Sequence, residues 1–238
     1  MSIQTVFLDA GGVLVNPNWI RVSDQLAAHG VHVSALALAA AEPHAKRRLD
    51  LGDTIRATND QQRGWTYFNL VLTEAGISLS EKTSAALAEL HAYHQQQNLW
   101  ETIPDGVRPS LAALRARGLR LVVVSNANGT LHRLFDRLDL TSAFDAIFDS
   151  FDEQIEKPDP RFFQLALERT GATADTTVHV GDLYHVDVVG ARSAAITPVL
   201  LDIGGLYADC DCQRIRALGE LDAALPAMDA SMTDCLKG

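Results

Sequence analysis

The sequence predicts an α/β fold in which a doubly wound parallel sheet is interrupted by an inserted helical domain. From Pro104 onward, short apolar runs alternate with segments of helical periodicity, which is the pattern of a parallel sheet. The run Leu119–Val124 is apolar and mostly β-branched, as in strands that are covered on both faces. Between Asn18 and Asn98 we find helical patterns and no convincing strand. The core is therefore expected to be Rossmann-like.

The first strand is predicted at Gln4–Leu8, directly before a glycine turn. The helical region that follows divides at turn and cap residues, and Ser80 with Glu81 beside it is a reasonable helix start. The helical segments expected here are Ile20–His29, Ser34–Leu51, Thr54–Ala75 and one that begins at Ser80.

The alternation of strands and helices in the second half completes the sheet. Gly118 and Gly171 each close a helix, as C-terminal glycines commonly do. Strands are expected at Leu119–Val124, Ala146–Phe148, Thr176–Val180 and Thr197–Leu201, and helices at Gly106–Arg117, Leu131–Leu138, Pro160–Thr170 and Val186–Ala194. We therefore predict a core domain from residues 1–15 and 99–238, and an inserted domain from residues 16–98.

Composition narrows the function classes. The 238 residues are 47% hydrophobic and 21% charged, which is typical of a globular protein with a sizeable core. A net charge of −10 argues against a nucleic-acid or anionic-membrane binder. No signal peptide is visible, no apolar run approaches the roughly 20 residues of a membrane helix, and the three cysteines fit reduced thiols. A cytoplasmic protein is expected, with oligomeric state undetermined.

Asp9 stands at the end of the first predicted strand, where open α/β sheets bind their ligands. A carboxylate there can act as a nucleophile and divide one difficult displacement into two easier ones. Gly11 and Gly12 follow in the turn, and Gly12 is a candidate for close contact with a bound phosphate.

Asp182 ends a later strand in the same way, and Asp187 begins the next helix. Together with Asp9 these carboxylates offer hard oxygen ligands of the kind that Mg²⁺ prefers. The sequence thus predicts a magnesium site at this edge of the sheet.

Two further positions offer groups for an anionic substrate. Ser125 and Asn126 follow a strand, so that a hydroxyl and an amide are available to a phosphoryl oxygen. Asn126 would either orient the substrate or order its loop. Lys157 lies between Glu156 and Pro158 in a loop stiffened by two prolines, where it can supply a fixed positive charge.

This set of motifs resembles the haloacid dehalogenase superfamily. The resemblance implies a helical cap inserted after the first strand, Asp9 as nucleophile toward phosphate esters, and Mg²⁺ as cofactor. It implies Asp182 as a direct metal ligand, Asp187 as a direct or indirect one, and the main-chain carbonyl of Gly11 as another ligand. The expected function is a phosphatase that acts on a small phosphorylated metabolite through an aspartyl-phosphate.

Gly11 departs from the resemblance, because the superfamily's phosphatases usually carry a second Asp there, as acid and base. A positioned acid–base group contributes about 10²–10⁴-fold to a rate. Either activity is weak on poor leaving groups, or another residue such as His185 or a cap residue supplies the proton. The cluster Lys46-Arg47-Arg48 is a candidate for a second anionic group, although a solvated helix face is the simpler interpretation.

Two alternatives remain open at this stage. A degenerate member would bind a phospho-ligand or a protein partner with little turnover. A metal-independent 2-haloacid dehalogenase would also lack the second Asp. Against it, the chain keeps both Asp182 and Asp187, and Arg21 is only a loose match to the arginine that dehalogenases carry after the first strand.

Overall fold

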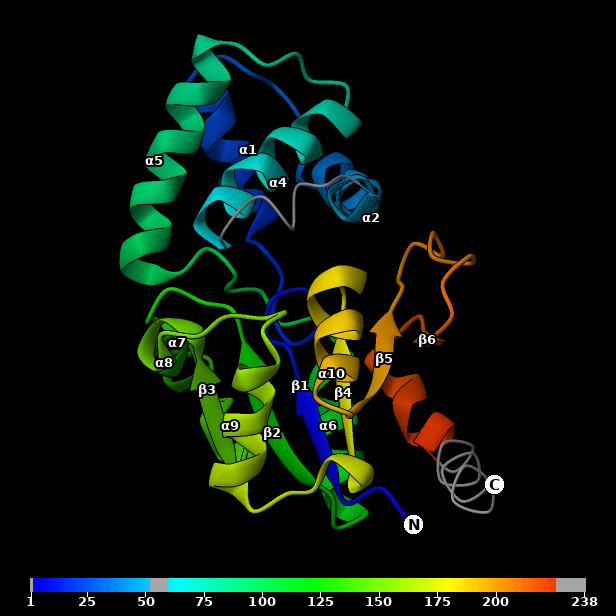
Figure 1. The fold of residues 1–238 in the computed structure, drawn as a ribbon. Coiled ribbons are helices and arrows are strands. Elements are labelled where there is room, and N and C mark those ends of the chain that lie inside the picture. The colour runs from blue at the N-terminus through cyan, green and yellow to red at the C-terminus, as the bar shows by residue number, and fades with distance from the viewer. Residues whose placement is uncertain (1, 52–59, 226–238) are drawn as a thin grey trace.

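The chain forms a six-stranded parallel sheet with helices on both faces. A further layer of helices lies beyond the carboxyl ends of the strands, as Figure 1 shows. The computed structural model describes residues 2–51 and 60–225, without the side chains of residues 60–63 and 65. The expected helix start at Thr54 and the thiol of Cys235 lie outside this range, while Cys210 and Cys212 are free thiols.

The strand order is β3-β2-β1-β4-β5-β6, so the first strand lies in the middle of the sheet. Every adjacent pair is parallel. The strands are β1 (Thr5–Leu8), β2 (Arg120–Ser125), β3 (Ala146–Asp149), β4 (Thr177–Gly181), β5 (Thr197–Leu201) and β6 (Gln213–Ile215). The predicted α/β fold class is confirmed.

The two faces of the sheet are covered by different helices because side chains alternate along each strand. Val6 and Leu8 pack into a cluster with α6 and α7, whereas Phe7 joins a cluster with α9 and α10 on the opposite face. The helices of this part are α6 (Val107–Ala116), α7 (Leu131–Arg137), α8 (Ser150–Glu153), α9 (Pro160–Thr170) and α10 (Val189–Ser193), with 3₁₀ turns at Thr141–Ala143, Ala174–Thr176 and Leu218–Glu220.

Four helices, which we call the cap helices, fill the described part of the chain between β1 and α6. They are α1 (Trp19–Ala28), α2 (Ala35–Leu51), α4 (Asp60–Glu74) and α5 (Glu81–Gln97). They share a hydrophobic cluster that is distinct from those of the sheet. The two connections meet at an isolated antiparallel bridge between Asn16 and Thr102. The division into a core of residues 1–15 and 99–238 and an insert of residues 16–98 stays a prediction.

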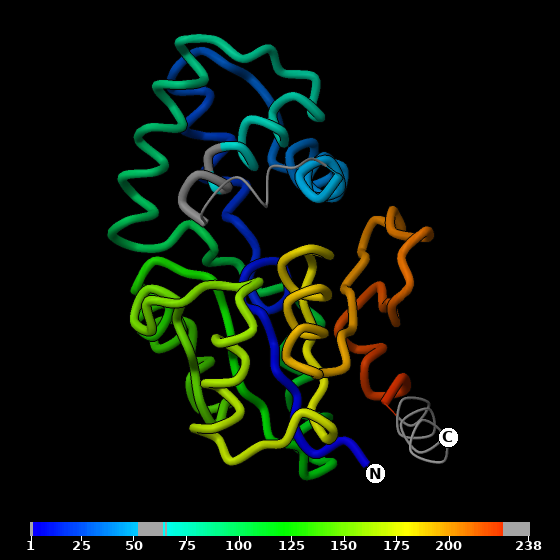
Figure 2. Tube along the Cα trace, viewed as in Figure 1, coloured from blue at the N-terminus to red at the C-terminus, as the bar shows by residue number. Residues whose placement is uncertain are grey.

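The chain trace in Figure 2 passes twice between the two layers, at the ends of the cap segment. One predicted helix differs in detail: the segment expected at Val186–Ala194 begins earlier, as a π-helical turn, η3 (Tyr184–Val188), and continues as α10. No helix within the described ranges is both long and apolar enough to cross a bilayer.

Candidate active site

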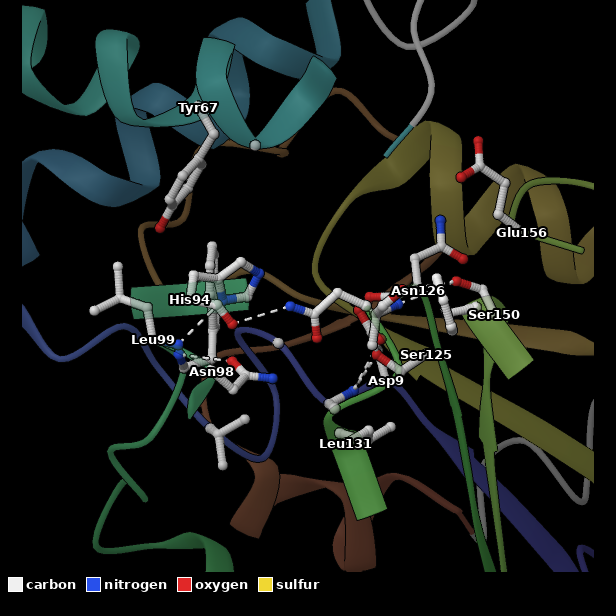
Figure 3. A pocket seen from close by; sticks show the side chains of 18 of the residues that line it. Asp9, Tyr67, His94, Asn98, Leu99, Ser125, Asn126, Leu131, Ser150 and Glu156 are labelled. Carbon is white, nitrogen blue, oxygen red and sulfur yellow. Dashed lines mark hydrogen bonds between the residues drawn. The ribbon is translucent and has the colours of Figure 1, made fainter. Parts of the chain in front are cut away.

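A cavity of about 580 Å³ lies between the cap helices and the carboxyl ends of the strands. The core side contributes polar residues, among them Asp9, Ser125 and Asn126, which gather at the strand ends in Figure 3. The cap side contributes mostly apolar and aromatic residues, and Tyr67 reaches down from α4 in the same view. The predicted strand-end residues therefore face a shared cavity.

Asp9 directly follows β1, and its carboxylate is held on one oxygen. Oδ1 accepts a hydrogen bond from the main-chain N–H of Ala10 at 2.8 Å and lies 3.0 Å from Nζ of Lys157. None of the residues that the structure describes donates a hydrogen bond to Oδ2. The contacts of Oδ1 thus fix the orientation of the carboxylate, and Oδ2 stays available for reaction.

Lys157 is fully buried and bridges two carboxylates, since its Nζ also lies 2.7 Å from Oδ1 of Asp187. Burial alone would lower the pKa of Lys157, but the charges of Asp187 and Asp9 outweigh it and raise the pKa. The lysine is therefore a permanent positive charge beside Asp9, the role suggested by its loop with Pro158 and Pro160.

Asp187 is satisfied on both oxygens. Oδ1 meets Lys157 and Nε2 of His179, the latter at 2.9 Å, and Oδ2 accepts the N–H of Leu183 at 3.1 Å. Burial opposes ionisation, but Lys157 and His179 outweigh it and lower the pKa of Asp187. This arrangement suits a residue that positions Lys157 better than one that coordinates a cation directly.

His179 was missed in the sequence, although a polar residue inside the apolar run Val178–Val180 was an available signal. It is fully buried on β4, packs edge-on against Phe163, and burial lowers its pKa. Its Nδ1 is one of two buried side-chain nitrogens without a hydrogen-bond partner within the described ranges. A neutral ring that donates from Nε2 to Asp187 accounts for both observations.

Asp182 follows β4 and is almost fully buried. Burial, together with the charges of Asp9 and Asp187, raises the pKa of the Asp182 carboxyl to about 7, although Lys46 opposes the rise. The elevated pKa reports mainly the burial of this carboxyl, with a smaller contribution from the neighbouring carboxylates.

Ser125 and Asn126 lie at the end of β2 with different surroundings. The Ser125 hydroxyl accepts only a long contact, 3.4 Å, from the N–H of Ala10. The Asn126 amide is fully engaged: it donates to the carbonyl of Lys157 at 2.9 Å and accepts from its N–H at 2.8 Å. Of the two roles predicted for Asn126, the geometry favours ordering the Lys157 loop.

Gly12 adopts a positive φ of 79°, and its N–H donates to the carbonyl of Val15 at 2.8 Å. A Cβ at this position would lie 1.9 Å from Oδ2 of Asp182, so only glycine fits. This N–H is therefore engaged within the loop, and a contact of Gly12 with a bound phosphate stays a prediction.

Gly11 faces the indole of Trp100. A Cβ built at Gly11 would lie 3.4 Å from both Cδ1 and Nε1 of Trp100. The indole thus occupies the direction in which a side chain at position 11 would extend. The sequence showed the missing carboxylate but not the aromatic ring that fills its place.

The cap side brings a second lysine to the site. Nζ of Lys46, on α2, lies 2.7 Å from Oδ2 of Asp182 and 2.7 Å from Oε1 of Glu42, which also accepts the Tyr67 hydroxyl at 2.8 Å. The adjacent Arg47 and Arg48 pair elsewhere, with Asp209 and Glu74. The basic cluster is therefore divided, and only its first member faces the cavity.

Two other candidate site residues lie away from the cavity. His185 does not line the cavity, and its ring lies 3.4 Å from Asp50, a buried cap carboxylate. Arg21 is paired with Glu101 at 3.0 Å and stacks over the Tyr93 ring. Neither His185 as proton donor nor Arg21 as a halide-site arginine is supported by this geometry.

The donor set fits a hard divalent cation. Carboxylate oxygens of Asp9, Asp182 and Asp187 lie within 4.8 Å of one another. These three carboxylates and Glu42 face two ammonium groups, so the site keeps a surplus of negative charge that a cation would neutralise.

A doubly wound sheet with a carboxylate at the end of its central first strand, a buried lysine beside it and a lid of helices defines a class of hydrolases. The family profile described as "haloacid dehalogenase-like hydrolase" matches residues 3–195. The chain belongs to this family.

Curated relatives have varied names. A haloacid dehalogenase-like hydrolase domain-containing protein 3 from Homo sapiens is 30% identical over 69% of this chain and 64% of its own length, and the one from Danio rerio matches over 42% of its length. The chain thus spans less than two thirds of these relatives. A phosphoserine phosphatase from Thermus thermophilus is 33% identical over 65% of this chain and 60% of its own.

Solved structures share the fold. A magnesium-bound HAD-hydrolase, YfnB from Bacillus subtilis, superposes with a TM-score of 0.70 at 17% identity, covering 94% of this chain and 99% of its own. A dehalogenase superposes with a TM-score of 0.64 at 21% identity, covering 94% and 97%. Because phosphatases and dehalogenases both occur among the similar proteins, likeness alone does not choose the reaction.

Proposed function

We propose that the protein is a Mg²⁺-dependent phosphatase that hydrolyses a small phosphorylated metabolite through an aspartyl-phosphate. The observation that carries the proposal is Asp9, oriented through Oδ1 by Lys157 and the Ala10 N–H, at the base of a cavity and within a cluster of three carboxylates. Phosphatases among the similar proteins support the reaction class.

In the first half-reaction, Oδ2 of Asp9 attacks phosphorus, the bond from phosphorus to the leaving oxygen breaks, and that oxygen takes a proton from water. In the second, water attacks phosphorus, the bond from phosphorus to Oδ2 breaks, and phosphate and the proton of the attacking water are released to solvent, which restores the carboxylate. Lys157 offsets charge near Asp9, and Ser125 is placed to donate to a phosphoryl oxygen. Its neighbour Asn126 keeps the Lys157 loop in position.

Asp9, Asp182 and the Gly11 carbonyl are the proposed metal ligands, with Asp187 acting through Lys157. A bound Mg²⁺ would supply electrostatic stabilisation for the transferring phosphoryl group.

The leaving group would occupy the upper cavity. That part is lined by aromatic and apolar side chains including Phe68, Leu90 and Trp100, with the neutral His94 among them. Burial, followed by repulsion from His91, lowers the pKa of His94 to about 4. A largely neutral alcohol portion fits this lining better than a second anionic group does.

The test is hydrolysis of p-nitrophenyl phosphate, whose good leaving group hardly needs the acid absent at Gly11. Turnover with Mg²⁺ should vanish in EDTA, and Asp9→Asn should reduce it by at least about 10³-fold. Asp105→Asn, an exposed position, is the matched control. Absence of turnover above Asp9→Asn contradicts the proposal.

Two further arms address the alternatives. Halide release from 2-haloacids in EDTA would establish dehalogenation instead. Phosphate binding by the wild type, measured calorimetrically without any hydrolysis, would favour the degenerate binding protein.

A further inference from the structure

Lys46 is the only described cap lysine that contacts a proposed metal ligand. Its side chain is 15% exposed, and its ammonium lies 2.7 Å from Oδ2 of Asp182. Glu42, one turn earlier on α2, holds the same ammonium at 2.7 Å and is itself fixed by the Tyr67 hydroxyl. The lysine is thus built into the cap and aimed at one carboxylate of the core.

The ammonium lies close to the loop that follows Asp9. A Cβ at Gly12 would be 2.7 Å from Nζ of Lys46 and 1.9 Å from Oδ2 of Asp182, so both atoms converge on the same small space. A divalent cation shared by Asp9 and Asp182 has to approach that carboxylate as well. The ammonium and the metal are both cations that seek the same oxygens.

We propose that Lys46 competes with the divalent cation for Asp182. With the cap in this position, metal entry requires the ammonium to leave Asp182, and bound metal in turn weakens this contact between cap and core. Because the two equilibria are linked, bound metal weakens the Lys46–Asp182 contact by the same factor by which that contact weakens metal binding. The inference rests on the proposed metal site but not on any catalytic turnover.

The charge of Lys46 persists at the pH of such measurements. Burial alone would lower the pKa of Lys46, but Asp182 and Glu42 outweigh it and raise the pKa. Replacing the lysine by methionine removes this charge and also frees Glu42 to add to the negative field. Both consequences favour the metal.

The first experiment is calorimetric titration of the full chain with Mn²⁺ and with Mg²⁺. We expect Lys46→Met to bind metal at least about 5-fold more tightly than the wild type, which is the lower end of typical coupling between sites. Lys46→Arg, which keeps the charge, should stay near the wild type.

Arg48→Met is the matched control, because it removes the same charge from the same helix but its partner, Glu74, lies within the cap. It should leave metal affinity unchanged. Asp182→Asn should abolish binding in either background. Far-ultraviolet circular dichroism and thermal unfolding in EDTA check that each variant is folded.

A second readout follows the lysine itself. Amine acetylation quantified by mass spectrometry should be faster at Lys46 when metal is saturating, while the exposed cap residue Lys82 serves as the internal reference. Equal or weaker metal binding by Lys46→Met, or unchanged Lys46 labelling, overturns the competition. If neither protein binds either metal, the proposed metal site is itself wrong.

Discussion

Two buried lysines meet the carboxylates of this site from opposite sides. Lys157, from the core, has no exposed side-chain surface and bridges Asp9 and Asp187. Lys46, from the cap, keeps 15% of its side chain exposed and bridges Glu42 and Asp182. Lys157 is held by a loop of the same α/β unit as its partners, whereas the contact of Lys46 with Asp182 exists only while α2 rests on the core. Both lysines stay charged, but the contact of Lys157 with its carboxylates is permanent and that of Lys46 with Asp182 is conditional.

Removal of each lysine charge tests this asymmetry directly. Lys157→Met leaves Asp9 and Asp187 buried without their cation, so we expect a loss of about 3–5 kcal/mol in the free energy of unfolding. Lys46→Met should cost clearly less, because water can reach Asp182 and Glu42 if the cap shifts. Urea unfolding in EDTA measures both. Equal losses in the free energy of unfolding would contradict the distinction between a permanent and a conditional contact.

The connection from the end of α5 into the core, residues 98–102, which we call the hinge, should respond to acid. The ring of His94 accepts the Leu99 N–H at 3.1 Å, and its pKa is lowered to about 4 from 6.5 by burial and by His91. The unfolded chain therefore binds more protons in this window, so this stability is complete above about pH 6.5 and is lost as the pH falls toward 4.

With the pKa lowered from 6.5 to about 4, the full effect is at most about 3.4 kcal/mol. Urea unfolding between pH 7.5 and 4 should show a shallower pH dependence in His94→Gln than in the wild type. His32→Gln, an exposed position on the cap, is the control. Identical slopes in His94→Gln and wild type would be inconsistent with a neutral hinge histidine.

Asp50 is another cap residue that contacts the core, and unlike Lys46 it does not line the cavity. This buried carboxylate accepts the N–H of Tyr184 at 2.7 Å, the N–H of His185 at 3.1 Å and the Tyr207 hydroxyl at 2.6 Å. Asp50→Asn replaces acceptor capacity by a donor, for an expected loss of about 2 kcal/mol. Chemical denaturation checks it against Asp24→Asn. A loss below that of the control would show that the cap is held by other contacts.

The smallest effect concerns the cap alone. Ser80 and Thr83 form a reciprocal capping box at the start of α5, far along the chain from Asp9 and the other candidate site residues. Ser80→Ala should reduce stability by about 1 kcal/mol with no change in metal affinity. Thermal unfolding of this variant and of Ser84→Ala, inside the same helix, measures it. A changed metal affinity would mean that cap stability and the site are more tightly coupled than their contacts suggest.

The elements predicted best were those with a strong local pattern. The strand expected at Leu119–Val124 is β2 (Arg120–Ser125), and the helix expected at Pro160–Thr170 has those bounds, since an Asp159 cap and the αL Gly171 terminate it. The strand β6 and the short α8 were not predicted. β6 spans three residues, two of them exposed, so it carries no apolar signal of its own.

The fold class and the core half of the candidate site follow from patterns in the amino-acid sequence alone. Parallel strands end at a common edge, so strand-end residues such as Asp9, Ser125 and Asp182 had to converge there whatever the details of packing. The side chains that contact these strand-end residues depend on tertiary packing. Lys46, Trp100 and His179 are brought to the site by the placement of the cap, the hinge and the neighbouring strand face, and such long-range contacts leave no periodic trace in the chain.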